Sequence, residues 1–246
     1  MDGFWNFLTT TGITATQLGL LKEIYVLLLL LPIVATIVSI ARYIIGARSL
    51  SIYTPIILTF LFFEFGRNLG SGQDVVKGLK YGFLFFFLIL FASALFYKLI
   101  RGFRLNYLPK LTIALILVSI IVFVTIIILA LVGEKGVILL DQFTLIVFVS
   151  LTESFISIMA RKSIRYGVST AIQTLVISIF SYLLVAQQGL QNILTQQPWI
   201  IILIIIANIY IGRFTGLRLS EYWRFRSILF KQQNKIDDKS GRNTAK

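Results

Sequence analysis

Side chains that could carry chemistry gather on one predicted helix, in and just after residues 136–159. Ser150, Glu153, Ser157 and Arg161 follow one another at spacings of three, four and four residues, which places them on one helical face. A carboxylate there could bind a proton or a cation, because ionisable groups at membrane depth are costly and usually functional. Alternatively, Glu153 is a buried hydrogen-bonded group or the partner of an arginine. The sequence leaves both interpretations open.

Few other ionisable residues lie near apolar segments. Asp141 falls on a different face from Glu153, and a lone aspartate cannot form the two-carboxylate site of an aspartyl-type protease. Glu64 and Arg67 are three residues apart on a helix, so we expect them to pair with each other. Arg42 and Arg48 flank a predicted turn, where arginine side chains reach toward lipid headgroups.

Hydroxyl side chains form a second pattern, within residues 167–185. Thr170, Thr174, Ser178 and Ser181 recur at i, i+4, i+8 and i+11, which aligns them along one helix face. Small hydroxyl residues let membrane helices approach closely and hydrogen-bond across their interface. We therefore predict a packing role for this hydroxyl stripe. A polar permeation path is the alternative.

Missing residue types exclude several classes of site. The chain has no cysteine and no histidine, which excludes disulfides, thiolate nucleophiles, Cys/His zinc sites and histidine bases. The segment 198–211 carries no lysine for a retinal Schiff base. The GSGQD sequence near residue 70 follows a predicted membrane span rather than a strand, so it is not a phosphate loop. We predict that the protein is not an enzyme and binds no cofactor or metal.

The elements that position these residues are membrane helices. The 246 residues are 57% hydrophobic and 13% charged, with a mean hydropathy of +0.89, and the apolar residues form long blocks. Blocks of this length predict an all-α, polytopic membrane helix bundle. The net charge is +13, and the charged residues lie at the ends of the blocks and in the tail. We therefore expect contacts with the lipid bilayer, anionic lipid headgroups and a cytoplasmic protein partner, and no binding of nucleic acid.

Seven apolar blocks are long enough to be considered as membrane spans. They cover residues 24–41, 50–65, 81–97, 108–132, 136–159, 167–185 and 198–211. The block 50–65 is short and contains Pro55, which is tolerated near a helix start. We predict that it crosses the membrane. A segment that dips in and returns would leave six crossings.

The basic residues predict the orientation of the chain. With seven crossings, connecting segments on one side hold 5 Lys and Arg and those on the other hold 18, which accounts for all 23. By the positive-inside tendency, the N-terminus lies outside and the C-terminus in the cytoplasm of a bacterial inner membrane. Six crossings would divide the residues 17 to 6 and bring the N-terminus inside, while leaving the C-terminus cytoplasmic.

The segments that flank the seven-helix domain (24–211) have distinct compositions. Residues 1–23 lack a basic signal region and carry clustered aromatics, which suits a short segment in the bilayer interface. Residues 212–230, GRFTGLRLSEYWRFRSILF, predict a basic amphipathic juxtamembrane helix that lies along an anionic leaflet or docks a cytoplasmic partner. Residues 231–246 are polar and charged, and we predict a disordered tail.

The juxtamembrane stretch also carries a recognisable pattern, G-R-x-T-G-x-R-L-S-E-x-x-R-F-R. It resembles the C-terminal signature of a bacterial seven-transmembrane domain that is usually fused to an inactive transglutaminase-like domain. The matching positions that we consider functional candidates are Arg213, Gly216, Arg218, Glu221, Arg224 and Arg226. Pro55 with Glu64, and Glu153 within LTESFISI, are similar to residues in the second and fifth spans of that family. The resemblance covers roughly residues 30–230.

The resemblance implies a membrane component of a system that also contains an ATP-grasp peptide ligase and a retropepsin-like protease. No transglutaminase-like domain is present in these 246 residues. Our leading hypothesis is a non-enzymatic anchor or assembly subunit whose basic cytoplasmic face recruits a soluble partner, such as the ligase. The alternative is a transporter or flippase for a polar or acidic solute, using Glu153, the hydroxyl stripe and the inner-end arginines. A third hypothesis is an intramembrane enzyme with an acid–base role for Glu153, Glu64 or Asp141.

Overall fold

The structure is a computed structural model, and it describes residues 15–68, 74–100, 102, 106–133, 142–197 and 199–213. Throughout these ranges the regular structure is helical, which confirms the predicted all-α fold class. The helices are α2 (Ala15–Ile40), the π-helix η1 (Ala41–Ile45), α3 (Tyr53–Asn68), α4 (Val75–Ile100), α5 (Tyr107–Leu131), α6 (Gln142–Arg161), α7 (Ile164–Val185), α8 (Gln188–Gln196) and α9 (Ile200–Gly212).

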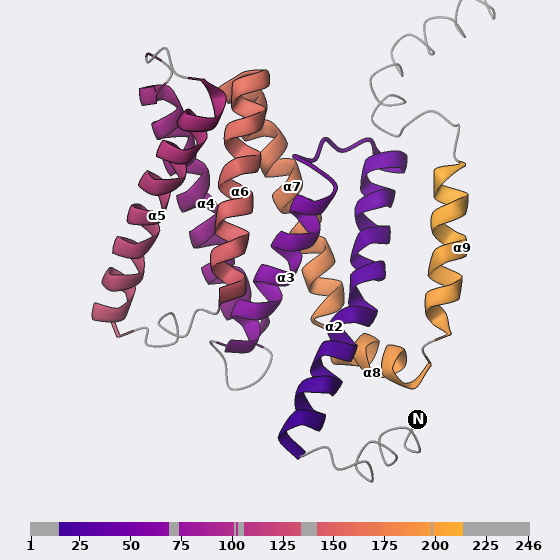
Figure 1. The fold of residues 1–246 in the computed structure, drawn as a ribbon. Coiled ribbons are helices and arrows are strands. Elements are labelled where there is room, and N and C mark those ends of the chain that lie inside the picture. Colours follow the sequence, from indigo (N-terminus) through magenta and orange to yellow (C-terminus); the bar gives the residue numbers. More distant parts are fainter. Residues whose placement is uncertain are drawn as a thin grey trace, which may run out of the picture.

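The long helices run side by side, and α8 lies across one end of them (Figure 1). We call this end the α8 end. The opposite end holds the connections from η1 to α3, from α4 to α5 and from α6 to α7. We call it the basic end, because the described residues there include eight cations: Arg42, Arg48, Lys98, Lys110, Arg161, Lys162, Arg165 and Arg213.

The longest helices have the length and composition of membrane spans. Five segments are long and apolar enough to cross a bilayer: Ile24–Ile45, Val75–Ile100, Tyr107–Leu131, Phe143–Arg161 and Ile164–Val185. The pair α8 and α9, bent by 106°, makes a sixth if it counts as one span. These features confirm the predicted multi-pass helix bundle. The side on which each terminus lies remains a prediction.

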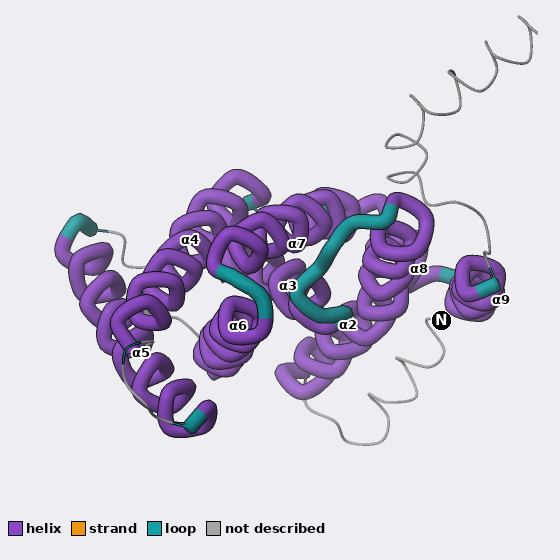
Figure 2. The backbone as a smooth tube through the Cα atoms, turned by 90° about the horizontal axis from the view of Figure 1, so that it is seen from above, coloured by secondary structure: helices purple, strands orange, loops and turns teal. Residues whose placement is uncertain are grey.

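Helix α3, predicted as the short second span, is the centre of the bundle. It contacts α2, α4, α6 and α7, and Figure 2 shows it enclosed among them. Its 16 residues extend about 24 Å, less than the roughly 30 Å of bilayer hydrocarbon. The helix nevertheless runs unbroken from the basic end to the α8 end and does not turn back (Figure 1). Packing against four neighbours compensates for its shortness, since little of its surface meets lipid.

Aromatic rings and glycines account for the close packing around α3. The Phe65 ring stacks on Phe85 of α4 at 5.5 Å between centroids, and Phe85 stacks on Phe148 of α6 at 5.1 Å. On α4, Gly78 and Gly82 face Phe62 of α3. A methyl group on Gly82 would meet the Phe62 ring, and one on Gly78 would lie 2.7 Å from the Phe62 carbonyl oxygen. The two helices therefore approach closely only because these positions lack side chains.

Several predicted boundaries differ from those in the structure. Helix α2 begins at Ala15, so the boundary predicted at residue 24 falls inside it. The block 136–159 corresponds to α6, which extends from Gln142 to Arg161. Helix α8 was not predicted, because it has nine residues and a mostly polar composition. Residues 1–14 and 214–246, which include most of the predicted interfacial segment, the juxtamembrane helix and the tail, lie outside the described residues.

Candidate functional site

The polar face of α6 lies on the outer surface of the bundle. Val147, Leu151 and Phe155 of α6 are buried against the core, whereas Glu153 is exposed on the opposite side. Arg161 is also exposed, and Ser150 and Ser157 are partly exposed. Within the described residues, no ion pair involves Glu153. Its carboxylate is therefore neither sealed in the core nor part of an enclosed site.

The hydroxyl stripe of α7 has the opposite environment. All four of its residues are buried, and two of them, Thr174 and Ser178, bond to α3 or to the segment that leads into it. The Ser178 hydroxyl donates to the Pro55 carbonyl oxygen at 3.1 Å, and the Leu50 backbone N–H donates to the Thr174 hydroxyl at 3.1 Å. Next to it, the Arg48 N–H donates to the side-chain oxygen of Gln173, the residue before Thr174, at 2.8 Å. Hydrogen bonds from the stripe thus connect α7 to the start of α3 and to the segment before it.

Pro55 lies in the first turn of α3, where its missing N–H leaves no helical bond unmade. Its carbonyl oxygen accepts hydrogen bonds from Thr59 of α3, at 2.7 Å, and from Ser178 of α7. The adjacent Thr54 hydroxyl lies 3.3 Å from that of Ser154 on α6. Pro55 therefore lies where α3, α6 and α7 meet.

Glu64 and Arg67 form the ion pair predicted from their spacing, at the α8 end of α3. The Arg67 guanidinium donates to both Glu64 carboxylate oxygens, at 3.1 and 3.3 Å. Glu64 is buried, whereas Arg67 is partly exposed. Two hydrogen bonds to one carboxylate fix the geometry at the end of the central helix.

Two cations at the basic end share one aromatic ring. The Lys162 ammonium lies 2.9 Å from the Tyr166 hydroxyl and 4.1 Å from its ring centroid. The Arg48 guanidinium approaches the same ring, at 5.6 Å from the centroid. Arg42 lies nearby in sequence, in the π-helical turn η1, and is partly buried. Tyr166 was missed by sequence reasoning, because Lys162 lies in the turn between α6 and α7 and Tyr166 in the first turn of α7, so no single-helix spacing joins them.

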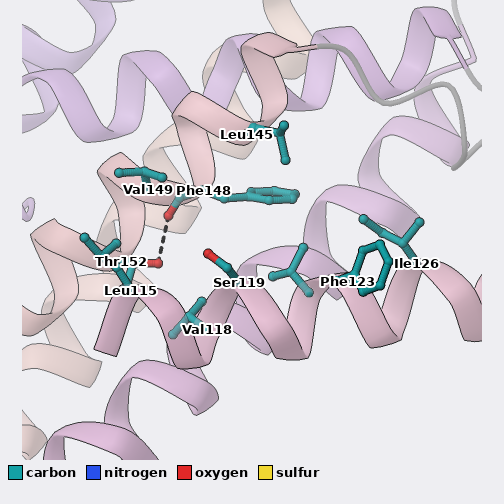
Figure 3. A pocket seen from close by; sticks show the side chains of 10 residues that line it. Leu115, Val118, Ser119, Phe123, Ile126, Leu145, Phe148, Val149 and Thr152 are labelled. Carbon is teal, nitrogen blue, oxygen red and sulfur yellow. Dashed lines mark hydrogen bonds between the residues drawn. The ribbon is translucent and has the colours of Figure 1, made fainter. Parts of the chain in front are cut away.

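An apolar groove between α5 and α6 was also not predicted (Figure 3). It has a volume of about 410 Å³, and Leu115, Val118, Phe123, Leu145, Phe148 and Val149 are among its lining residues. Ser119 and Thr152 bring hydroxyls to it, and the Thr152 hydroxyl donates to the Phe148 carbonyl oxygen at 2.8 Å. The groove depends on how far the two helices splay, which no single-helix pattern encodes.

The remaining candidates lie at or beyond the end of α9. Arg213 caps that helix and is exposed at the basic end. Asp141, Gly216, Arg218, Glu221, Arg224 and Arg226 lie outside the described residues. Across the part of the chain that is described, no group of acidic residues is arranged to hold a metal ion.

Comparison with known families agrees with this architecture. A family model described as seven transmembrane helices usually fused to an inactive transglutaminase matches residues 12–229. The chain belongs to this family. Membership in this seven-transmembrane family confirms the resemblance drawn from the sequence, which covered roughly residues 30–230. Searches of curated proteins and of solved structures found no match.

Proposed function

We propose that this integral membrane protein is a non-enzymatic anchor that recruits a soluble protein with an acidic surface to the basic end of its bundle. The observation that carries the proposal is the charge distribution over the described residues. Eight cations lie at the basic end, and none of the four acidic residues in the described ranges lies there. Glu23, Glu64 and Asp74 belong to the α8 end, and Glu153 lies near the middle of α6.

The surroundings of these cations support a docking role. Arg48, Lys162, Arg165 and Arg213 are exposed. Like charges gathered on one face raise its potential and attract an oppositely charged partner from solution. The ATP-grasp ligase of the systems implied by the sequence resemblance is our candidate for that partner. The bacterial inner membrane, with this end in the cytoplasm, is the location that fits the charge distribution.

The structure gives less support to a transporter. That hypothesis needs Glu153, the hydroxyl stripe and the inner-end arginines to line one path. Glu153 instead faces outward from α6, whereas Ser178 and Thr174 of the stripe are buried and hydrogen-bonded at the α3–α7 contact. The stripe and the carboxylate thus lie on different surfaces of the bundle.

Co-purification after mild cross-linking of membranes tests the proposal. We expect the native chain to retain a soluble acidic protein, and the variant Arg48→Gln, Lys162→Gln, Arg165→Gln to lose most of it. The matched control is Lys77→Gln with Lys80→Gln, which removes charge from the α8 end and should leave recovery unchanged. Recovery should also fall at 0.5 M NaCl, where the Debye length is only about 4 Å. Equal recovery by both variants would contradict the proposal.

A further inference from the structure

The polar outer face of α6 lies at a depth where lipid cannot satisfy it. Helix α6 has 20 residues, or about 30 Å, and Glu153 lies within one turn of its midpoint. The neighbours of Glu153 on the outer surface include the exposed Ile146 and Val149, as expected for a face in hydrocarbon. A carboxylate at mid-bilayer is costly unless a partner group meets it. We therefore expect a cationic group from outside the described bundle to pair with the Glu153 carboxylate.

The described part of a second copy of the chain offers no such group. A two-fold contact between parallel α6 helices would bring Glu153 against its own equivalent, and two like charges repel. Every lysine and arginine in the described ranges lies in the first or last two or three turns of a helix or in a connection. None of them is at the depth of Glu153, so a displaced contact between copies also leaves the carboxylate without a cation.

The surface around Glu153 has the features of a helix-docking face. Ser150 and Ser157 flank the carboxylate, and small residues of this kind let two membrane helices approach closely. The apolar groove opens beside it, since Val149, one turn before Glu153, lines the groove (Figure 3). A neighbouring helix could thus place a cation at Glu153 and a bulky apolar side chain in the groove.

We infer that this face of α6 binds a transmembrane helix of another protein that carries a lysine or arginine near its midpoint. Charge complementarity selects the partner, and Ser150, Ser157 and the groove provide the close fit. The inference is independent of the proposed recruitment at the basic end, because it concerns a membrane-embedded partner at a different surface.

Synthetic helices test the inference without knowledge of the natural partner. The purified chain, labelled at an introduced Gly189→Cys, is placed in phosphatidylcholine vesicles with acceptor-labelled Leu/Ala peptides whose central residue is lysine or leucine. Energy transfer should show that the central-lysine peptide binds about 5- to 30-fold more tightly. Glu153→Gln, which keeps the shape of the side chain and removes its charge, should bring the ratio of the two peptides' dissociation constants close to one. The control Asp74→Asn, at the α8 end, should preserve it.

A second measurement uses native membranes. A photoreactive side chain at position 157 should cross-link α6 to a polypeptide whose membrane span contains lysine or arginine, and Glu153→Leu should reduce that product. Equal binding of the two peptides, or a preference that survives Glu153→Gln, would overturn the inference. So would cross-links from position 157 that join only lipid or a second copy of the chain.

Discussion

Close approach of α4 to the central helix makes Gly78 a sensitive position. A methyl group there would lie 2.7 Å from the Phe62 carbonyl oxygen and would also meet the Tyr182 hydroxyl. The first obstacle is backbone, so a side-chain rotation cannot relieve it. Overpacking of this kind costs about 2–3 kcal/mol, at the upper end of its usual range. Alanine's better helix propensity offsets about 1 kcal/mol of that. We expect Gly78→Ala to lower the free energy of unfolding by about 1–2 kcal/mol.

Unfolding in mixed detergent micelles, titrated with sodium dodecyl sulfate and followed by circular dichroism, measures this loss. Gly189→Ala is the matched control, because nothing lies within 4 Å of a methyl group at that position of α8. It should be neutral or slightly stabilising. Tyr182→Phe removes one of the two obstacles, so it should restore part of the stability lost in Gly78→Ala. Equal stability of Gly78→Ala and Gly189→Ala would refute the packing argument.

Three further predictions concern polar contacts between or within helices, each measured by the same detergent titration. Ser178→Ala removes the hydrogen bond to Pro55 and should lower the free energy of unfolding by about 0.5–1.5 kcal/mol. No change would mean that the hydroxyl stripe does not stabilise the contact with α3. Asn208→Leu removes the 2.6 Å hydrogen bond from α9 to Thr36 of α2, so it should lower the free energy of unfolding by about 1 kcal/mol. It should also speed amide hydrogen exchange in α9, and unchanged exchange would contradict this. Glu64→Gln should lower the free energy of unfolding by about 1–2 kcal/mol, less than for a fully buried ion pair, because the Arg67 side chain is 37% exposed. An unchanged free energy of unfolding would show that the pair contributes nothing.

Apolar blocks predicted the long helices well because a bilayer imposes a length and a composition on each span. The block 50–65 illustrates the limit of this logic. Its shortness left open whether it crosses. The structure shows that α3 lies among four other helices, a placement that the composition of the block does not predict. Helix α8 was missed for the converse reason, because its nine residues carry no long apolar run.

Side-chain periodicity predicted which candidate residues share a face, but not where that face points. The α7 hydroxyls and the α6 residues around Glu153 both follow helical spacing. The first set is buried and Glu153 in the second is exposed, because burial depends on which neighbours each helix meets. The pairing of Glu64 with Arg67 was predictable, since both residues belong to one turn of one helix.

We expect this bundle to cross the membrane with its basic end in the cytoplasm. Labelling with a membrane-impermeant maleimide tests it directly, because the chain has no cysteine of its own. Gly102, at the basic end, and Gly189, in α8, both have room for a new side chain. In spheroplasts with an intact inner membrane, we predict labelling of Gly189→Cys and protection of Gly102→Cys until the inner membrane is permeabilised. Labelling of Gly102→Cys with protection of Gly189→Cys, or equal labelling of both, would contradict the account.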